Sequence, residues 1–234
     1  STTDPIIYHK YGNIGNYTVR LTVTDNGGLT GTTSKLVTIN LPPQANFDYT
    51  PEYPYVGDVV TFNASSSTAG GNRTIVSYVW DFGDGNLTTV TTAVITHRYM
   101  VAGNYTVVLI ISDNEGYTDT LTKVTTVLPS PPIADFIYTP DFPIAREIIV
   151  FNASNSSDID GTVVSYMWNF GDGNTTTTTN SIITHKYAMY GNYTVILTIT
   201  DSQGLSDNKT LNVRVRDYPT ANFTVSPVMP NVNT

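Results

Sequence analysis

The sequence predicts an all-β protein built from tandem β-sandwich modules of about 88 residues each. Three observations carry this prediction: an internal repeat, strands with a period of two, and a turn of the form Asp-x-x-Gly at the end of a strand in each copy. No stretch shows the sustained apolar period of a helix, so almost no helix is expected. Proline-rich junctions between the repeats favour an extended rod of modules.

The internal repeat is a Gly-Asn-Tyr-Thr-Val motif that returns every 88 residues, an interval that Trp80 and Trp168 also keep. The motif begins at Gly15, Gly103 and Gly191. We therefore divide the chain into the C-terminal part of one module (1–41), two complete modules (42–129 and 130–217) and the opening strand of a further module (218–234). The complete modules are called module I and module II below.

The strand that follows each motif alternates apolar and polar side chains, as in Tyr105, Val107, Leu109 and Ile111 of module I. This period of two indicates a strand with one buried face. In the Asp-x-x-Gly turn that ends the strand, Asp accepts hydrogen bonds from the backbone and Gly supplies a positive φ. Several short strands in about 88 residues favour a two-sheet sandwich over a propeller blade, which is near half that length.

Aromatic residues predict the core of each module. Trp80 and Trp168 lie in the middle of a Tyr-x-Trp-x-Phe strand, where an indole fills the space between two sheets. Tyr17, Tyr105 and Tyr193 open a later strand and resemble the tyrosine that braces a sandwich corner.

These motifs resemble the PKD (polycystic kidney disease) domain family, in which a Trp-Asp-Phe-Gly-Asp-Gly segment precedes a Gly-x-Tyr-x-Val strand and turn. Module I matches the segment from Trp80 to Gly85, and module II departs from it at Asn169, where Asp is expected. The resemblance covers essentially the whole chain. It implies an immunoglobulin-like sandwich in an extracellular setting, with roles in surface layers, in adhesion or as accessory modules of secreted hydrolases, and it implies no catalytic residues.

Composition excludes several classes of protein. Charged residues make up 13% of the chain and the net charge is −8, so the basic patch that nucleic acid binding needs is absent and no nucleic acid partner is expected. The longest aliphatic run, from Val107 to Ile111, is far shorter than the roughly 20 residues of a membrane span. No membrane span is expected in this segment. Without cysteine there are no disulfides and no thiol chemistry.

Acceptor sequons for N-linked glycans are about twice as frequent as chance placement predicts. The eleven asparagines are Asn16, Asn63, Asn72, Asn86, Asn104, Asn152, Asn155, Asn174, Asn192, Asn208 and Asn222. They predict a heavily glycosylated outer surface. The alternative is that threonine-rich strands generate such triplets by themselves.

Residues that invite a catalytic interpretation have simpler structural ones. Asp84 and Asp172 each lie between two glycines, in a sequence typical of a tight turn. His9, His97 and His185 occur once in each repeat, which provides no cluster of metal ligands and suggests a polar strand end. We therefore expect no enzyme activity.

The segment from Asp158 to Gly161 is the one acidic cluster with the spacing of oxygen ligands. Some relatives in the PKD family bind calcium near this loop, so the resemblance makes Asp158 and Asp160 candidate calcium ligands. A plain polar loop is the alternative. No cofactor other than calcium is expected.

Two sets of side chains are candidate contact surfaces. Val108, Ile110 and Ile196 share a strand face with Ser and Thr, and they meet a neighbouring module or subunit or are covered by a long loop. Tyr53, Tyr55 and Phe142 are candidates for a sugar or fibre platform, with core or linker packing as the alternative. An unpaired opening strand from Ala221 to Val225 is a candidate for strand exchange between subunits.

The function expected from these observations is that of an extracellular structural glycoprotein. Tandem modules would form part of a surface layer, stalk or filament, with adhesion as a further role and neighbouring copies of the same protein as partners. The competing class is a non-catalytic accessory or binding module of a secreted protease or glycan-degrading enzyme.

Overall fold

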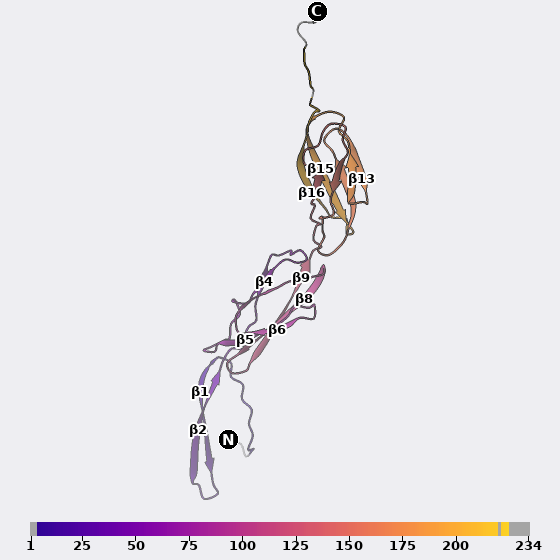
Figure 1. Cartoon of the computed structure of the whole chain (residues 1–234). Coiled ribbons are helices and arrows are strands. Elements are labelled where there is room, and N and C mark those ends of the chain that lie inside the picture. The colour runs from indigo at the N-terminus through magenta and orange to yellow at the C-terminus, as the bar shows by residue number, and fades with distance from the viewer. Residues whose placement is uncertain (1–3, 220, 225–234) are drawn as a thin grey trace, which may run out of the picture. The chain divides into compact units, whose positions relative to one another are not determined.

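The computed structural model describes residues 4–219 and 221–224, in which the chain forms sixteen strands and no helix (Figure 1). The chain divides into two compact units, Ser1–Leu128 and Pro129–Thr234. The first unit contains module I and the two-stranded sheet that precedes it, and the second contains module II. Each module is a two-sheet, immunoglobulin-like β-sandwich, as the sequence predicts.

Module I consists of a three-stranded antiparallel sheet in the order β3-β4-β7 and a four-stranded antiparallel sheet in the order β6-β5-β8-β9. The strands are β3 (Asp48–Thr50), β4 (Val60–Asn63), β5 (Ile75–Asp81), β6 (Leu87–Val90), β7 (Val94–His97), β8 (Gly103–Asp113) and β9 (Thr118–Val127). The longest strands, β8 and β9, pair along their length and form the hairpin that carries the Asp-x-x-Gly turn.

Module II repeats this topology with the sheet orders β10-β11-β14 and β13-β12-β15-β16. The strands are β10 (Ile137–Thr139), β11 (Ile149–Asn152), β12 (Val163–Asn169), β13 (Thr175–Thr178), β14 (Ile182–His185), β15 (Gly191–Asp201) and β16 (Ser206–Val215). The register shift in β5 between Ile75 and Ser77 recurs in β12 between Val163 and Ser165. The two modules therefore share details of strand pairing as well as sheet order.

A tryptophan lies at the centre of each core. Trp80 and Trp168 are both 0% exposed. In module I the rings of Phe47 and Phe62 lie 5.1 and 5.6 Å from the Trp80 ring, from the opposite side of the sandwich. From Val107 to Asp113 every second side chain of β8 is buried, which is the period of two that the sequence predicts.

The turn after each long strand is built as expected. In module I, Asp113 Oδ1 accepts hydrogen bonds from the backbone amides of Glu115 and Tyr117, at 3.0 and 2.9 Å. Gly116 has a φ of 86°, a left-handed conformation that favours glycine. The same turn recurs in the two-stranded sheet and in module II, with a φ of 86° at Gly28 and 87° at Gly204.

The tyrosines that open the long strands each donate a hydrogen bond to a carbonyl four residues upstream. Tyr105 donates to Val101 at 2.7 Å and Tyr193 to Met189 at 2.9 Å, and both rings pack at the edge of their core. This is the tyrosine-corner geometry. Tyr17 makes the same bond, to Asn13 at 3.0 Å.

Tyr17 is nevertheless not a core residue, which corrects the expectation from sequence. It lies on β1 (Gly15–Thr24), which pairs only with β2 (Thr30–Ile39) in a two-stranded sheet (Figure 1). With no second sheet packed on it among the described residues, the face that is buried in β8 is open here, and Leu21 and Val23 are each 58% exposed. A core needs both layers of the sandwich.

The opening strand expected in 218–234 falls largely outside the described residues. The described part, 218–219 and 221–224, contains no strand, and Phe223 is 85% exposed there. The corresponding Phe47 and Phe136 are fully buried in modules I and II. They have the sheets of their own module to pack against.

Candidate functional site

A histidine and an aspartate that lie 13 residues apart in the chain are paired in both modules. His97, at the end of β7, lies 2.7 Å through Nε2 from Asp84 Oδ2, in the turn between β5 and β6. His185 and Asp172 repeat the contact at 2.8 Å. The His97 ring stacks on the Phe82 ring with centroids 4.1 Å apart. The sequence analysis does not predict this pairing. The signal for it is that the two histidines and the two aspartates are each 88 residues apart, so both residue types recur together in the repeat.

The surroundings of Asp84 assign it a structural role. Burial raises the pKa of its carboxyl, but hydrogen bonds from the Asn86 backbone amide and from His97 outweigh that effect and hold the pKa below its ordinary value. Asn86 donates to the same carboxylate from its side chain, at 3.0 Å. The carboxylate of Asp84 thus accepts hydrogen bonds from its own turn and from His97 at the end of β7. These bonds connect the β5–β6 turn to the end of β7.

Asp113 is the buried carboxylate of module I among the described residues, at 2% exposed. Besides the two turn amides bound to Oδ1, its Oδ2 lies 2.5 Å from Arg73 Nη1. Burial raises the pKa of this carboxyl, and the backbone amides of Tyr117 and Glu115 together with the Arg73 guanidinium lower it below its usual range. Both carboxylate oxygens of Asp113 therefore have hydrogen-bond partners within the protein, and Arg73 balances its charge.

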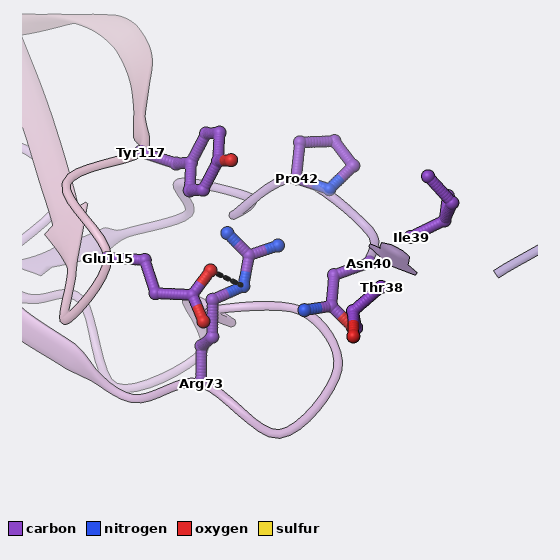
Figure 2. Close-up of a pocket in the computed structure, with 7 residues that line it drawn as sticks. All are labelled: Thr38, Ile39, Asn40, Pro42, Arg73, Glu115 and Tyr117. Carbon is purple, nitrogen blue, oxygen red and sulfur yellow. Dashed lines mark ion pairs between the residues drawn. The ribbon is translucent and has the colours of Figure 1, made fainter. Parts of the chain in front are cut away.

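Arg73 lies in a pocket formed by the end of β2, the segment that follows it and the β8–β9 turn. Figure 2 shows its guanidinium among Glu115, Tyr117 and Pro42. The Tyr117 ring lies 4.6 Å from the guanidinium carbon, and Nη2 donates a hydrogen bond to the Leu41 carbonyl. Arg73 therefore connects the buried carboxylate to the segment that leads into module I.

Module II has the same buried aspartate but no arginine beside it. Asp201 is 2% exposed, and its Oδ1 accepts hydrogen bonds from the amides of Gln203 and Leu205 at 2.9 and 2.8 Å. Its Oδ2 is buried without a hydrogen-bond partner. An unpaired buried carboxylate oxygen is costly in free energy, so a cationic or protic partner is expected at this position.

The predicted calcium ligands lie in the loop that contacts Ser202 and Gln203, the two residues after Asp201. Asp158 Oδ1 accepts a hydrogen bond from the Asp160 amide at 3.2 Å, while Asp158 Oδ2 is buried without a partner. Both carboxylate oxygens of Asp160 accept from the Ser130 amide at 3.2 Å. A Cβ added to Gly161 would lie within 3.0 Å of three oxygens. These are Asp158 Oδ2, Gln203 Oε1 and Ser202 Oγ.

This donor set fits a hard cation. Calcium takes six to eight oxygen ligands from carboxylates, amides, carbonyls and water. The Gln203 amide donates through Nε2 to the Asp160 carbonyl at 3.1 Å, which turns Oε1 toward Gly161. Within the described residues, no three carboxylate or imidazole side chains form a metal-binding group. The oxygens of Gln203 and Ser202 would therefore have to complete the set.

The remaining candidates from sequence are surface residues. Val108, Ile110 and Ile196 are half-buried on β8 and β15, inner strands of the four-stranded sheets, and alternate there with the buried core side chains. Tyr53, Tyr55 and Phe142 are 61%, 44% and 65% exposed. Arg216 lies over the Phe142 ring, 4.3 Å from its centroid.

Sequon asparagines lie mainly at the surface. Ten of the eleven are exposed, and Asn152 is half-buried. Asn86 and Asn174 each donate from Nδ2 to the aspartate of their turn at 3.0 Å. No helix in the part of the chain that the structure describes is long and apolar enough to cross a membrane.

The fold and these sites define a class of protein: tandem immunoglobulin-like sandwich modules in which charged side chains hold turns and linking segments in place. The model of the PKD domain family matches residues 40–128 and 129–215. The chain therefore belongs to the PKD domain family, as its motifs indicate. No catalytic domain is evident in the matched segments.

Two curated relatives illustrate where such modules occur. The chain is 33% identical over 186 residues to the pre-pro-metalloprotease PrtV of Vibrio cholerae, a match that covers 78% of this chain and 18% of the relative. It is 30% identical over 237 residues to the human dyslexia-associated protein KIAA0319, a match that covers 92% of this chain and 22% of that protein. The chain thus spans about a fifth of the length of these relatives.

Among solved structures, the PKD1 domain of the Vibrio cholerae metalloprotease PrtV is 34% identical in sequence. The match covers 37% of this chain and 99% of that domain, with a TM-score of 0.33.

Proposed function

We propose that the chain is a non-catalytic extracellular spacer, a set of modules that links other parts of a surface or secreted glycoprotein. The observation that carries this proposal is the structural use made of carboxylates. In both modules Asp84, Asp113 and their counterparts Asp172 and Asp201 bind turn amides, which makes them part of the scaffold. Exposed sequons support an extracellular setting with N-linked glycans as part of the outer surface.

The spacer acts mechanically. Each module buries its own tryptophan-centred core, so stability is local and length grows by adding copies. Modules of this kind suit assembly end to end into a rod, within a surface layer, stalk or filament. Electron microscopy of native material tests it: a regular lattice or filament supports the proposal, whereas isolated globular particles contradict it. Intact-mass analysis of the same material reads the glycans directly.

Self-association with neighbouring copies is part of this proposal. Val108 and Ile110 provide a half-buried apolar stripe on the outer face of module I. Analytical ultracentrifugation of wild type and of a V108T/I110T variant tests whether copies contact one another through it. A concentration-dependent assembly that the variant loses supports the stripe as a contact, and an unchanged sedimentation pattern removes it.

A second candidate function is an accessory binding module of a secreted hydrolase. Relatives named as a metalloprotease and as collagenases favour it. In module II, exposed Tyr190 and Tyr218 line an open pocket with Arg146 and Asp217, a mixture of aromatic and charged groups that suits a sugar or fibre ligand. Tyr53, Tyr55 and Phe142 are the candidates from sequence.

Pull-down on insoluble collagen and on insoluble polysaccharide separates the two functions. Retention that Y190A/Y218A or F142A abolishes supports the binding module. Tyr8→Ala is the matched control, because Tyr8 is 95% exposed and lies outside both modules. Absence of retention on either material rejects this candidate for the materials tested and leaves the spacer proposal standing.

We further propose that module II holds a calcium ion through Asp158 and Asp160, with Gln203 and Ser202 as additional oxygen donors. The ion would neutralise two neighbouring carboxylates and supply the missing partner of the buried Asp158 Oδ2. Isothermal titration with calcium measures binding directly, and D158N and D160N are expected to weaken it at least tenfold. Asp141→Asn is the control, because it removes the same charge at an exposed position.

A further inference from the structure

We propose that one end of module II binds an acidic polysaccharide, a polymer whose sugar units carry carboxylate or sulfate groups. The site consists of Arg146, Arg214 and Arg216 together with the exposed rings of Tyr190 and Tyr218. This inference rests on the second candidate function, that of a binding module, and names the chemical class of its ligand.

Two adjacent pockets form the site. They have volumes of about 270 and 390 Å³ and share Tyr190 and Asp217 in their linings. Arg146 lines the first pocket, and Arg214 and Arg216 line the second. Neighbouring pockets with a cation in each suit an extended ligand that carries a negative charge on successive units. A chain of acidic sugars is such a ligand.

The backbone conformation of Arg146 is the first sign of a role for its side chain. Its φ is 68°, and no other non-glycine residue in the described part of the chain has a positive φ. The Arg146 amide donates to the Tyr187 carbonyl at 2.8 Å, as the Gly57 amide of module I donates to the Tyr99 carbonyl at 2.9 Å. The two positions therefore correspond. Glycine adopts this conformation freely, whereas arginine adopts it at a cost in free energy that a structural role of the backbone does not explain.

The other two arginines are also particular to module II. Arg214 has the position in the pairing of the two long strands that Thr126 has in module I. Arg216 forms the parallel bridge that Leu128 forms in module I. The backbone is thus paired in the same way in both modules at all three positions. Module I has the uncharged residues Gly57, Thr126 and Leu128 there, so the fold itself does not require the arginines.

The three guanidinium groups are free to bind an anion. None of them forms an ion pair with another described residue. Arg216 lies over the Phe142 ring, 4.3 Å from its centroid, which holds its side chain in place. Asp217 is the one carboxylate in the lining of the two pockets, and its Oδ1 accepts the Tyr218 amide at 2.9 Å.

These charges produce a locally positive region on a chain whose net charge is −8. Such a region attracts anionic ligands, and a guanidinium group binds a carboxylate through two parallel hydrogen bonds. The same fork geometry binds other oxyanions. The charge of the ligand follows from this set of side chains.

The aromatic rings favour a saccharide over an acidic protein as the ligand. Tyr190 and Tyr218 are 61% and 58% exposed and line the first pocket. A tyrosine offers an apolar face on which a sugar ring packs and a hydroxyl that bonds its polar edge. A sugar unit is small enough to enter pockets of this size, whereas a stable protein interface covers about 800 Å² of each partner.

Biolayer interferometry of the full chain on immobilised polygalacturonate, dextran sulfate and neutral dextran tests the inference. We expect binding to the first two and none to neutral dextran, with an affinity that falls as salt is added. The triple variant R146G/R214T/R216L gives module II the residues of module I. It should weaken binding about tenfold or more, because three charged contacts are lost.

The matched control is K10T/R20T/K35T. It removes the same number of cations from exposed positions outside both modules and should bind as wild type does. Should the triple variant of module II not fold, R214T provides the second test, because Arg214 is exposed on β16.

R146G alone separates binding from stability. It removes the cation and the strained backbone together, so it should weaken binding without lowering the melting temperature of module II. A lower melting temperature with unchanged binding would show that Arg146 is structural, and would overturn its part in the site.

Three further results would overturn the inference. The first is the absence of binding to either acidic polysaccharide, and the second is an equal loss in the control variant, which would mean that net charge alone matters. The third is equal binding to single-stranded DNA, which would indicate general attraction of polyanions. In each case, retention on collagen or on a neutral polysaccharide in the pull-down still decides the binding function separately.

The chain is measured with and without glycans, because Asn192 carries a sequon and lines the second pocket. Binding by both forms supports the site. Binding by the unglycosylated chain alone would show that the native protein keeps the pocket covered, and the inference would then be wrong.

Discussion

His97 and Asp84 form a hydrogen-bonded pair at 2.7 Å that joins the end of β7 to the turn between β5 and β6. The histidine ring is held between Phe82, on which it stacks, and Tyr99, which meets it edge-on at 4.7 Å. Tyr99 in turn donates its hydroxyl to the Phe82 carbonyl at 3.0 Å. Module II repeats all of these contacts with His185 and Asp172. The pair is therefore a structural unit of the module.

Asp84 makes module I less stable in acid. The pKa of its carboxyl in the folded protein lies below the ordinary value of 3.8, so its contribution is present above that value and is lost as the pH falls through the folded pKa. We expect D84N to remove this part of the acid dependence and to lower the free energy of unfolding at neutral pH by about 1–3 kcal/mol. Urea unfolding between about pH 2 and 7, followed by tryptophan fluorescence, measures both effects.

Asp141→Asn is the control for that experiment, since Asp141 is exposed. A D84N profile parallel to that of wild type across the acid range would show that Asp84 does not contribute in this way. His97→Phe keeps a ring that stacks on Phe82 and removes the partner of Asp84. It should therefore resemble D84N at neutral pH.

The tyrosine corner predicts a graded set of effects. Y105F and Y193F each remove a hydroxyl that donates to a backbone carbonyl at the edge of a core, and each should lower the free energy of unfolding of its module by about 0.5–1.5 kcal/mol. Y17F removes the same bond from the two-stranded sheet, where no core depends on it. Thermal unfolding of both modules should be unchanged by Y17F, and equal effects of all three changes would contradict this reading.

Removing a core tryptophan should unfold one module and spare the other. W80A deletes the largest buried side chain of module I and should cost about 3–5 kcal/mol there. Each module has its own core cluster and one tryptophan, so Trp168 fluorescence reports on module II in this variant. We expect the Trp168 transition to keep its midpoint, with W168A and Trp80 as the reciprocal pair. A shared shift in both transitions would indicate coupled folding.

Glycan occupancy should follow exposure. Asparagines such as Asn104 and Asn208 are exposed on strands, whereas Asn152 is half-buried and its Oδ1 accepts the Ser154 amide at 2.9 Å. Glycopeptide mass spectrometry of native material is expected to find Asn104 and Asn208 occupied and Asn152 largely unmodified. An unmodified chain throughout would favour the alternative, that threonine-rich strands generate the sequons.

Much of the fold is predictable because its signals are local and repeated. The alternation along β8 and β15, the positive φ at Gly116 and Gly204 and the burial of the tryptophans all follow from short segments whose spacing is visible in the chain. The prediction that Tyr17 is a core residue is wrong because it depends only on the local motif, whereas a core also requires a second sheet. The same residue type in the same motif is part of a core only where a second sheet covers it.

The sequence by itself determined the class of protein, its repeat and the position of the turns, since each of these depends on neighbours within a few residues. Only the tertiary structure decided which charges meet. Asp84 reaches His97 across 13 residues, and Asp113 reaches Arg73 across 40. Contacts of that kind are set by how two sheets and their loops close on one another. The unpaired oxygen of Asp201, which singles out module II, becomes visible only once the corresponding oxygen of Asp113 is seen bound to an arginine.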